Sequence, residues 1–193
     1  MTDTLTLLDQ AELFQLALSA SAAGDGASAL AYLKTAVARV DATPAAHYLL
    51  GAEYAQLKLY ERAMDEMEAA LALDPALWTA RIQLALLYLA ADRGGRAVDV
   101  LEPLAQQGQD QASQRFGAGL LRLAAEDLAG ARAALAEGIG LNDANPALNG
   151  DMQRIVDDIG RRIGAPDDAG GDDGDDEGET RLLLSAYAGN QAH

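Results

Sequence analysis

Apolar residues recur at spacings of three and four positions along most of the first 163 residues, which is the pattern of amphipathic α-helices. The stretch 43–75 shows this most clearly, as two apolar sets joined by a short connection. The first set is His47, Leu50, Gly51 and Tyr54, and the second set is Ala63, Met67, Ala70 and Leu71. Each set occupies one helical face, so we predict two short helices joined by a turn, with Pro75 closing the unit.

The residue types of this unit recur with a constant period of 34 residues. Small residues stand at Ala17, Gly51, Ala85 and Gly119. A second register reads Ala29, Ala63, Ala97 and Ala131, and a third reads Leu33, Met67, Leu101 and Leu135. Glycine and alanine are needed where paired helices cross closely, because a larger side chain would hold the backbones apart. We therefore predict successive helix pairs that bury the two small-residue registers at their crossings.

The signature of this unit resembles the tetratricopeptide repeat (TPR) family, whose 34-residue pattern is W-x2-L-G-x2-Y, then A-x3-F, then P. His47 replaces the Trp and Met67 replaces the Phe, and the other signature positions of the unit match. The remaining units depart further, since the aromatic register keeps only Tyr54 and Tyr88. The resemblance implies an all-α TPR-type solenoid of about four helix pairs followed by a C-terminal capping helix.

The repeat register predicts the domain organisation. We expect a frayed N-terminus at 1–8 and four TPR units over 9–143. The units cover about 10–43, 44–77, 78–111 and 112–145.

Helix starts carry recognisable capping residues. Asp9 and Glu12 have the spacing of a capping box and predict the start of the first helix. The pairs Thr43-Pro44, Asp74-Pro75 and Asn145-Pro146 each place an N-cap side chain before a proline suited to the first helical position. We predict that these pairs start the second, third and last helical blocks.

Residues 146–163 read as one amphipathic helix. Its apolar face holds Leu148, Met152, Ile155, Val156, Ile159 and Ile163, and its other face is charged. A terminal repeat exposes an apolar flank, and a helix of this kind is suited to cover it. We predict that it is the capping helix.

The composition changes after this helix. Residues 165–180 hold eight acidic residues and four glycines, which predicts a disordered acidic linker. The tail 181–193 returns to apolar character at Leu182, Leu183, Leu184 and Tyr187, a possible motif for self-association or for a separate partner.

Charge and composition exclude several classes of protein. The formal net charge of −16 disfavours binding to nucleic acid or to an anionic membrane. The sequence has no cysteine, and we expect no signal peptide and no membrane span, so we predict a cytoplasmic protein. The bias toward arginine, 12 against 2 lysines, suggests a bacterial source.

Catalytic chemistry is not indicated. His47 occupies a packing register and His193 ends the tail, and no nucleophile motif or phosphate loop is present. The acidic run starting at Asp173 resembles the opening of a calcium loop, but its twelfth position is Leu184, which cannot supply a carboxylate. We predict neither enzymatic activity nor a cofactor or metal.

The TPR resemblance implies a concave groove lined by the first helix of each pair. The predicted groove residues are Phe14, Leu18, Tyr48, Ala52, Gln56, Ile82, Leu86, Leu89, Phe116, Leu120 and Leu123, and Ser21 belongs to one of their registers. Their apolar character would suit an apolar helix or an extended peptide of another protein. The alternative is that several of these side chains are buried between adjacent helices.

Two functions remain open on this sequence. The first is a non-catalytic scaffold or adaptor that binds another protein or peptide in the groove. The second is a dedicated TPR chaperone of a bacterial secretion system that holds a client segment.

Overall fold

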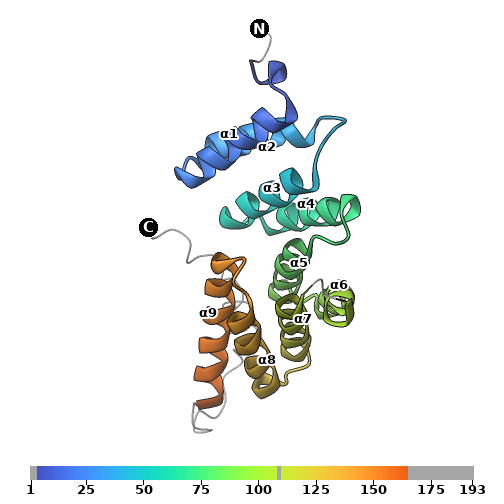
Figure 1. Cartoon of the computed structure of the whole chain (residues 1–193), viewed down its shortest axis with the longest axis vertical. Helices are drawn as coiled ribbons and strands as arrows, with labels where there is room; N and C mark the ends of the chain where they lie inside the picture. Colours follow the sequence, from blue (N-terminus) through green and yellow to red (C-terminus); the bar gives the residue numbers. More distant parts are fainter. Residues whose placement is uncertain (1–3, 108–109, 165–193) are drawn as a thin grey trace. The chain divides into compact units, whose positions relative to one another are not determined.

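The computed structural model describes residues 4–107 and 110–164, and the regular secondary structure in these ranges is helical (Figure 1). The elements are η1 (Thr4–Leu7), α1 (Gln10–Ala22), α2 (Gly26–Val37), α3 (Pro44–Gln56), α4 (Tyr60–Leu73), α5 (Trp78–Ala90), α6 (Gly94–Gln107), α7 (Gln111–Ala124), α8 (Leu128–Leu141) and α9 (Pro146–Gly164). The chain divides into an N-terminal unit, 1–80, and a C-terminal unit, 81–193, with the division inside α5. The fold class predicted from the sequence is therefore correct.

Within each unit, helices that follow one another in the sequence pack together as pairs. In the N-terminal unit α1 packs on α2 and α3 on α4, while α2 also contacts α3. In the C-terminal unit α6 packs on α7, α7 packs on α8 and α8 packs on α9 (Figure 1). A hydrogen bond of 3.0 Å from Arg96 Nη2 to the Tyr88 hydroxyl joins α5 to α6. This is the helix-pair arrangement that the 34-residue period predicts.

The small-residue registers lie at the helix crossings. Ala29, Ala63, Ala97 and Ala131 are fully buried, as are Leu33, Met67, Leu101 and Leu135. A Cβ atom on Gly51 would lie 3.0 Å from Met67 Cγ and 3.1 Å from the Ala63 carbonyl oxygen. The small position of the first helix thus meets the alanine and the large apolar residue of the second helix, which confirms the predicted burial of these registers.

A left-handed residue ends the first helix of every pair. Its φ is 73° at Gly24, 60° at Lys58, 54° at Asp92 and 60° at Glu126, so the conformation recurs every 34 residues. The backbone N–H of the next residue donates a hydrogen bond to the carbonyl oxygen five residues before it, as in Asp25 N to the Ala20 oxygen at 2.9 Å and Leu59 N to the Tyr54 oxygen at 2.9 Å. Only one of the four positions is glycine, so residue type does not reveal this register.

Replacing Lys58 by glycine is expected to stabilise the protein by about 0.5–1 kcal/mol, because glycine adopts a positive φ without a steric penalty. Urea denaturation measures the change in the free energy of unfolding. Lys58→Ala removes the same side chain but retains a Cβ atom, and it serves as the control. An equal gain from both variants would show that the lysine side chain, rather than its backbone conformation, is responsible.

A short helical turn precedes α1 at the N-terminus. Residues 1–8 were expected to fray, but Thr4–Leu7 form a 3-10 turn. Leu5 and Leu8 pack against the buried cluster of Leu13, Ala36 and Ala46. These contacts tie residues 5–8 to the first helix pair, and the fraying expected for 1–8 stays a prediction.

Two of the three proline-marked helix starts are confirmed. Thr43 caps α3 by accepting a hydrogen bond from Ala46 N at 3.2 Å, and Asn145 Oδ1 accepts one from Leu148 N at 3.1 Å. The prediction for Asp74-Pro75 is wrong, because α5 begins at Trp78. Asp74 instead ends α4, and its Oδ1 accepts a hydrogen bond from Ala76 N at 2.9 Å within the connection.

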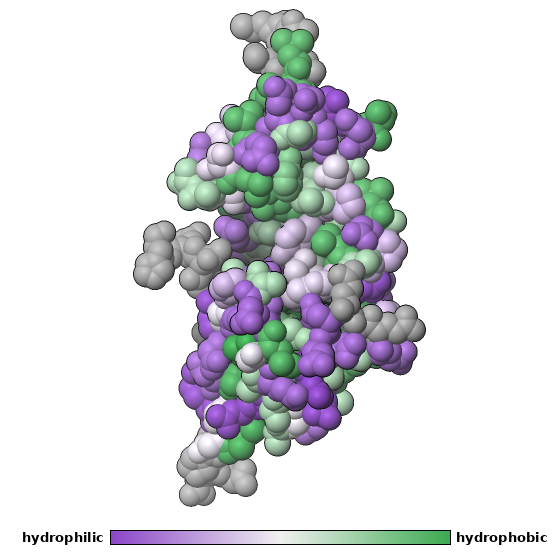
Figure 2. All heavy atoms as spheres, in the orientation of Figure 1, coloured by the Kyte–Doolittle hydropathy of each residue, from purple (hydrophilic) through white to green (hydrophobic). Residues whose placement is uncertain are grey.

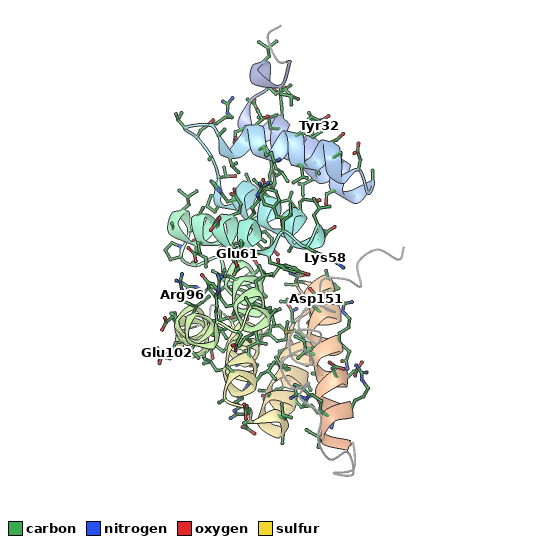
Figure 3. All side chains as sticks on the ribbon, turned by 180° about the vertical axis from the view of Figure 1, so that it is seen from behind. Tyr32, Lys58, Glu61, Arg96, Glu102 and Asp151 are labelled. Carbon is green, nitrogen blue, oxygen red and sulfur yellow. The ribbon has the colours of Figure 1, made fainter. Side chains whose placement is uncertain are left out.

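Helix α9 packs on α8 as the predicted capping helix would. Leu148, Met152, Ile155, Val156 and Ile159 are buried, whereas Ile163 is 49% exposed near the end of the helix. Asp151, near the start of α9, is half-buried and pairs with Arg154 (Figure 3). Burial raises the pKa of the Asp151 carboxyl to about 6 from its ordinary 3.8, although the Arg154 charge acts to lower it.

Replacing Asp151 by asparagine should therefore stabilise the protein at pH 7.5. The folded state binds the Asp151 proton more tightly than the unfolded chain, so stability is lost as pH rises from about 4 to about 6. We expect the free energy of unfolding of the variant to rise by about 1–2 kcal/mol at pH 7.5. This is less than the full pKa shift of Asp151 corresponds to, because the substitution weakens the contact with Arg154. Thermal unfolding at pH 7.5 and pH 4 measures the difference.

The gain from Asp151→Asn should nearly vanish at pH 4, where aspartate is largely protonated in the folded protein. Asp157→Asn, at an exposed position of the same helix, is the control and should show no such dependence. A gain that is equal at both pH values would contradict the explanation by desolvation.

Candidate partner-binding surface

The structure divides the predicted groove residues into two groups. Five are buried, which agrees with the alternative that several of these side chains pack between adjacent helices. These five are Ile82, Leu86, Phe116, Leu120 and Leu123. Phe116 shows why, since its ring lies 2.7 Å from where a Cβ atom of Gly138 on α8 would be. These five side chains are part of the core and offer little surface to a partner.

The accessible residues of the N-terminal unit lie on α1 and α3. Phe14, Tyr48 and Ala52 are half-buried, and Leu18 and Gln56 are exposed; these five residues are called the α1–α3 face. Leu18 is 39% exposed and is one of several exposed leucines in this unit. Figure 2 shows apolar atoms among polar ones on the visible side of this unit. The sixth accessible residue, Leu89, lies in the C-terminal unit.

Local capping and packing fix the two helices that carry this face. Asp9 and Glu12 form the predicted capping box of α1, with hydrogen bonds of 2.8 and 2.9 Å. Phe14 packs against the buried cluster shared by α1, α2 and α3. At the other end of α1, Ser21 Oγ donates a 2.5 Å hydrogen bond to Glu53 Oε1 on α3. The two helices that carry the α1–α3 face are therefore linked near both ends of α1.

The α1–α3 face contains no charged residue, and its chemistry is that of an apolar contact surface. Phe14 and Tyr48 supply aromatic rings, Leu18 and Ala52 supply aliphatic area, and Gln56 supplies an amide at the rim. An acid, the buried Glu53 on α3, accepts a hydrogen bond from Ser21 on α1 beyond the end of this face. The sequence pattern does not distinguish Glu53, a buried acid, from the exposed acids around it.

Other polar contacts of the N-terminal unit are structural. His47 Nδ1 lies 2.7 Å from Glu66 Oε2, so this half-buried histidine joins α3 to α4. The Tyr54 ring lies 5.8 Å from Lys34 Nζ and 5.8 Å from the guanidinium of Arg62. Cations at this distance from an aromatic face stabilise the contact between neighbouring helices.

The described residues offer neither a cluster of metal ligands nor a membrane-spanning helix. No group of three or more histidine, aspartate or glutamate side chains in residues 4–107 and 110–164 is arranged to hold a metal ion. Over the same ranges, every helix is too short or too polar to span a bilayer.

The C-terminal predictions lie outside the described residues. They are the acidic linker at 165–180, the tail 181–193 and the motif of Leu182, Leu183, Leu184 and Tyr187. Their proposed roles stay predictions.

Comparison with solved structures shows which known proteins share this fold. MamA 41-end from Desulfovibrio magneticus RS-1 superposes with a TM-score of 0.56 at 18% identity, covering 96% of this chain and 99% of that one. The MamA RS-1 ArsTM double mutant gives 0.56 at 19% identity, covering 93% and 95%. No protein-family model matches the chain, and no curated protein sequence does. At this identity the likeness concerns the fold, which is an all-α TPR-type solenoid.

Proposed function

We propose that the protein is a non-catalytic interaction scaffold that binds an apolar helix or extended peptide of another protein on the α1–α3 face. The observation that carries the proposal is the exposure of Leu18 one turn from the half-buried Phe14 on α1, together with the half-buried Tyr48 on α3. Apolar side chains on a preformed helical face are what an amphipathic partner segment requires. The TPR-type fold supports this use, since stacked helix pairs present extended surfaces for other proteins.

Replacing Leu18 by glutamate is expected to lower partner affinity at least tenfold while the protein stays folded. A charge at the centre of an apolar contact must be desolvated when the partner binds, which costs several kcal/mol unless the charge is paired. The measurement is quantitative mass spectrometry of proteins retained from source-cell extract by the immobilised variant and by the wild type. Circular dichroism checks the fold.

Leu16→Glu is the matched control. Leu16 lies on the same helix and is 38% exposed against 39% for Leu18, but it points away from the α1–α3 face. We expect Leu16→Glu to retain the partners that Leu18→Glu loses. Equal retention by both variants would refute the proposed surface.

The same experiment separates a scaffold from a secretion chaperone. A scaffold is expected to retain folded proteins. One stoichiometric client that is insoluble without this protein would favour the chaperone and would leave the α1–α3 face as the binding surface.

A further inference from the structure

One buried acidic side chain of the N-terminal unit has no cationic partner within the described residues. Glu53 on α3 is 4% exposed, and Ser21 Oγ donates the hydrogen bond that its Oε1 accepts. Burying a carboxylate is unfavourable unless a cation or several hydrogen-bond donors compensate its charge. Among the described residues, the Ser21 hydroxyl is the side-chain donor that contacts this carboxylate.

The position of Glu53 places this carboxylate at one end of the α1–α3 face. Ser21 follows Leu18 by three residues and so lies on the same side of α1, one turn further along. The second carboxylate oxygen, Oε2, lies 3.6 Å from where a Cβ atom of Gly26 would be. Since Gly26 has no side chain and both Ser21 and Gly26 are only half-buried, this side of the carboxylate is thinly covered.

The N-terminus of α2 provides limited compensation. Gly26 is the first residue of α2, and a helix N-terminus carries a partial positive charge. Asp25, however, already caps this helix by accepting a hydrogen bond from Ser28 N, and it adds a negative charge of its own. The surroundings of Glu53 thus supply a hydroxyl donor and a capped helix N-terminus, and no cationic side chain of the described residues pairs with it.

Helix packing does not require an acid at this position. The residues at steps of 34 from Glu53 are Ser19, Leu87, Leu121 and Ile155, none of them charged. Leu87 on α5 is buried and Leu121 on α7 is half-buried, so an apolar side chain fills the same place in these two pairs. An acid that costs stability here and is not needed for packing points to a role in binding.

We propose that Glu53 accepts a lysine or arginine side chain of the partner bound on the α1–α3 face. This inference rests on the proposed function and specifies it: the partner segment carries a basic residue next to its apolar contact residues. A basic segment also complements the formal net charge of −16. Because the pair would be desolvated, we expect salt to weaken binding only modestly.

The experiment selects binders from a displayed library of random 12-residue peptides, using the full chain as bait. Wild-type protein is expected to enrich peptides with apolar residues and an adjacent Lys or Arg, each at least threefold over the input. Glu53→Gln keeps the size and the hydrogen bond of the side chain but removes its charge, and it should lose the basic enrichment alone. Glu66→Gln, at an acid that already pairs with His47, is the control and should select as the wild type does.

The outcomes separate this inference from the proposed function. Basic enrichment that persists in Glu53→Gln, or its absence in the wild type, would overturn the role of Glu53 and leave an apolar binding face. Enrichment by Leu18→Glu equal to that of the wild type, or no selection by the wild type, would overturn the proposed function as well.

A second readout needs no peptide. If the charge is uncompensated in the free protein, Glu53→Gln should raise Tm by about 2–6 °C at pH 7. A lower Tm would mean that the folded chain itself stabilises the charge, and the inference would then fail.

Discussion

Replacing Phe116 by alanine is expected to lower the free energy of unfolding by about 3–5 kcal/mol, the largest effect of any single change considered. The ring is fully buried on α7 and packs against α8 at Gly138. Its removal loses the burial of an aromatic side chain and leaves a cavity that rigid helices cannot close. Urea denaturation followed by circular dichroism measures the loss.

Phe14→Ala is the matched control, because Phe14 occupies the same register on α1 but is only half-buried. Its loss should be clearly smaller than that of Phe116→Ala. If Phe116→Ala cost less than about 1 kcal/mol, the ring would have to be on an accessible surface, and the division between buried and accessible groove residues would be wrong.

Replacing Gly138 by alanine is expected to cost about 1–3 kcal/mol, although alanine favours helix more than glycine does. The new Cβ atom would lie 2.7 Å from two atoms of the Phe116 ring and 3.2 Å from Arg115 Cβ, so helix α7 or the ring would have to move. Gly140→Ala, two residues further along α8, meets nothing within 4 Å and should be neutral or stabilising. Thermal and urea denaturation of the two variants compare these effects.

The two changes should couple when combined. In the Phe116→Ala background the ring is gone, so Gly138→Ala is expected to cost nothing further. Strictly additive losses would show that the close contact between Gly138 and Phe116 does not determine the packing of α7 on α8.

The sequence was sufficient to predict the helix pairs because packing imposes a strict period on small residues. Gly119 illustrates the reason: a Cβ atom there would lie 2.7 Å from Leu135 Cγ, so the position excludes large side chains. The N-caps Asp9, Thr43 and Asn145 could likewise be predicted. Few side chains can accept hydrogen bonds from the free backbone N–H groups of a first helical turn.

The residues of the proposed binding face were predictable only in part. A leucine in a groove register and a leucine in the core have the same side chain, so burial of Leu120 and exposure of Leu18 depend on the surrounding helices. The left-handed turn residues were hidden because lysine, aspartate and glutamate occupy three of those positions. Glu53 was missed because its burial depends on α1, α2 and α3 together.

The most direct test of the proposed binding face is hydrogen–deuterium exchange of the wild-type protein with and without a peptide selected from the library. Binding on the α1–α3 face predicts slower exchange in α1 and α3, Gln10–Ala22 and Pro44–Gln56, and no such change for Leu18→Glu at the same peptide concentration. Protection confined to the C-terminal unit, or protection that Leu18→Glu leaves intact, would contradict it.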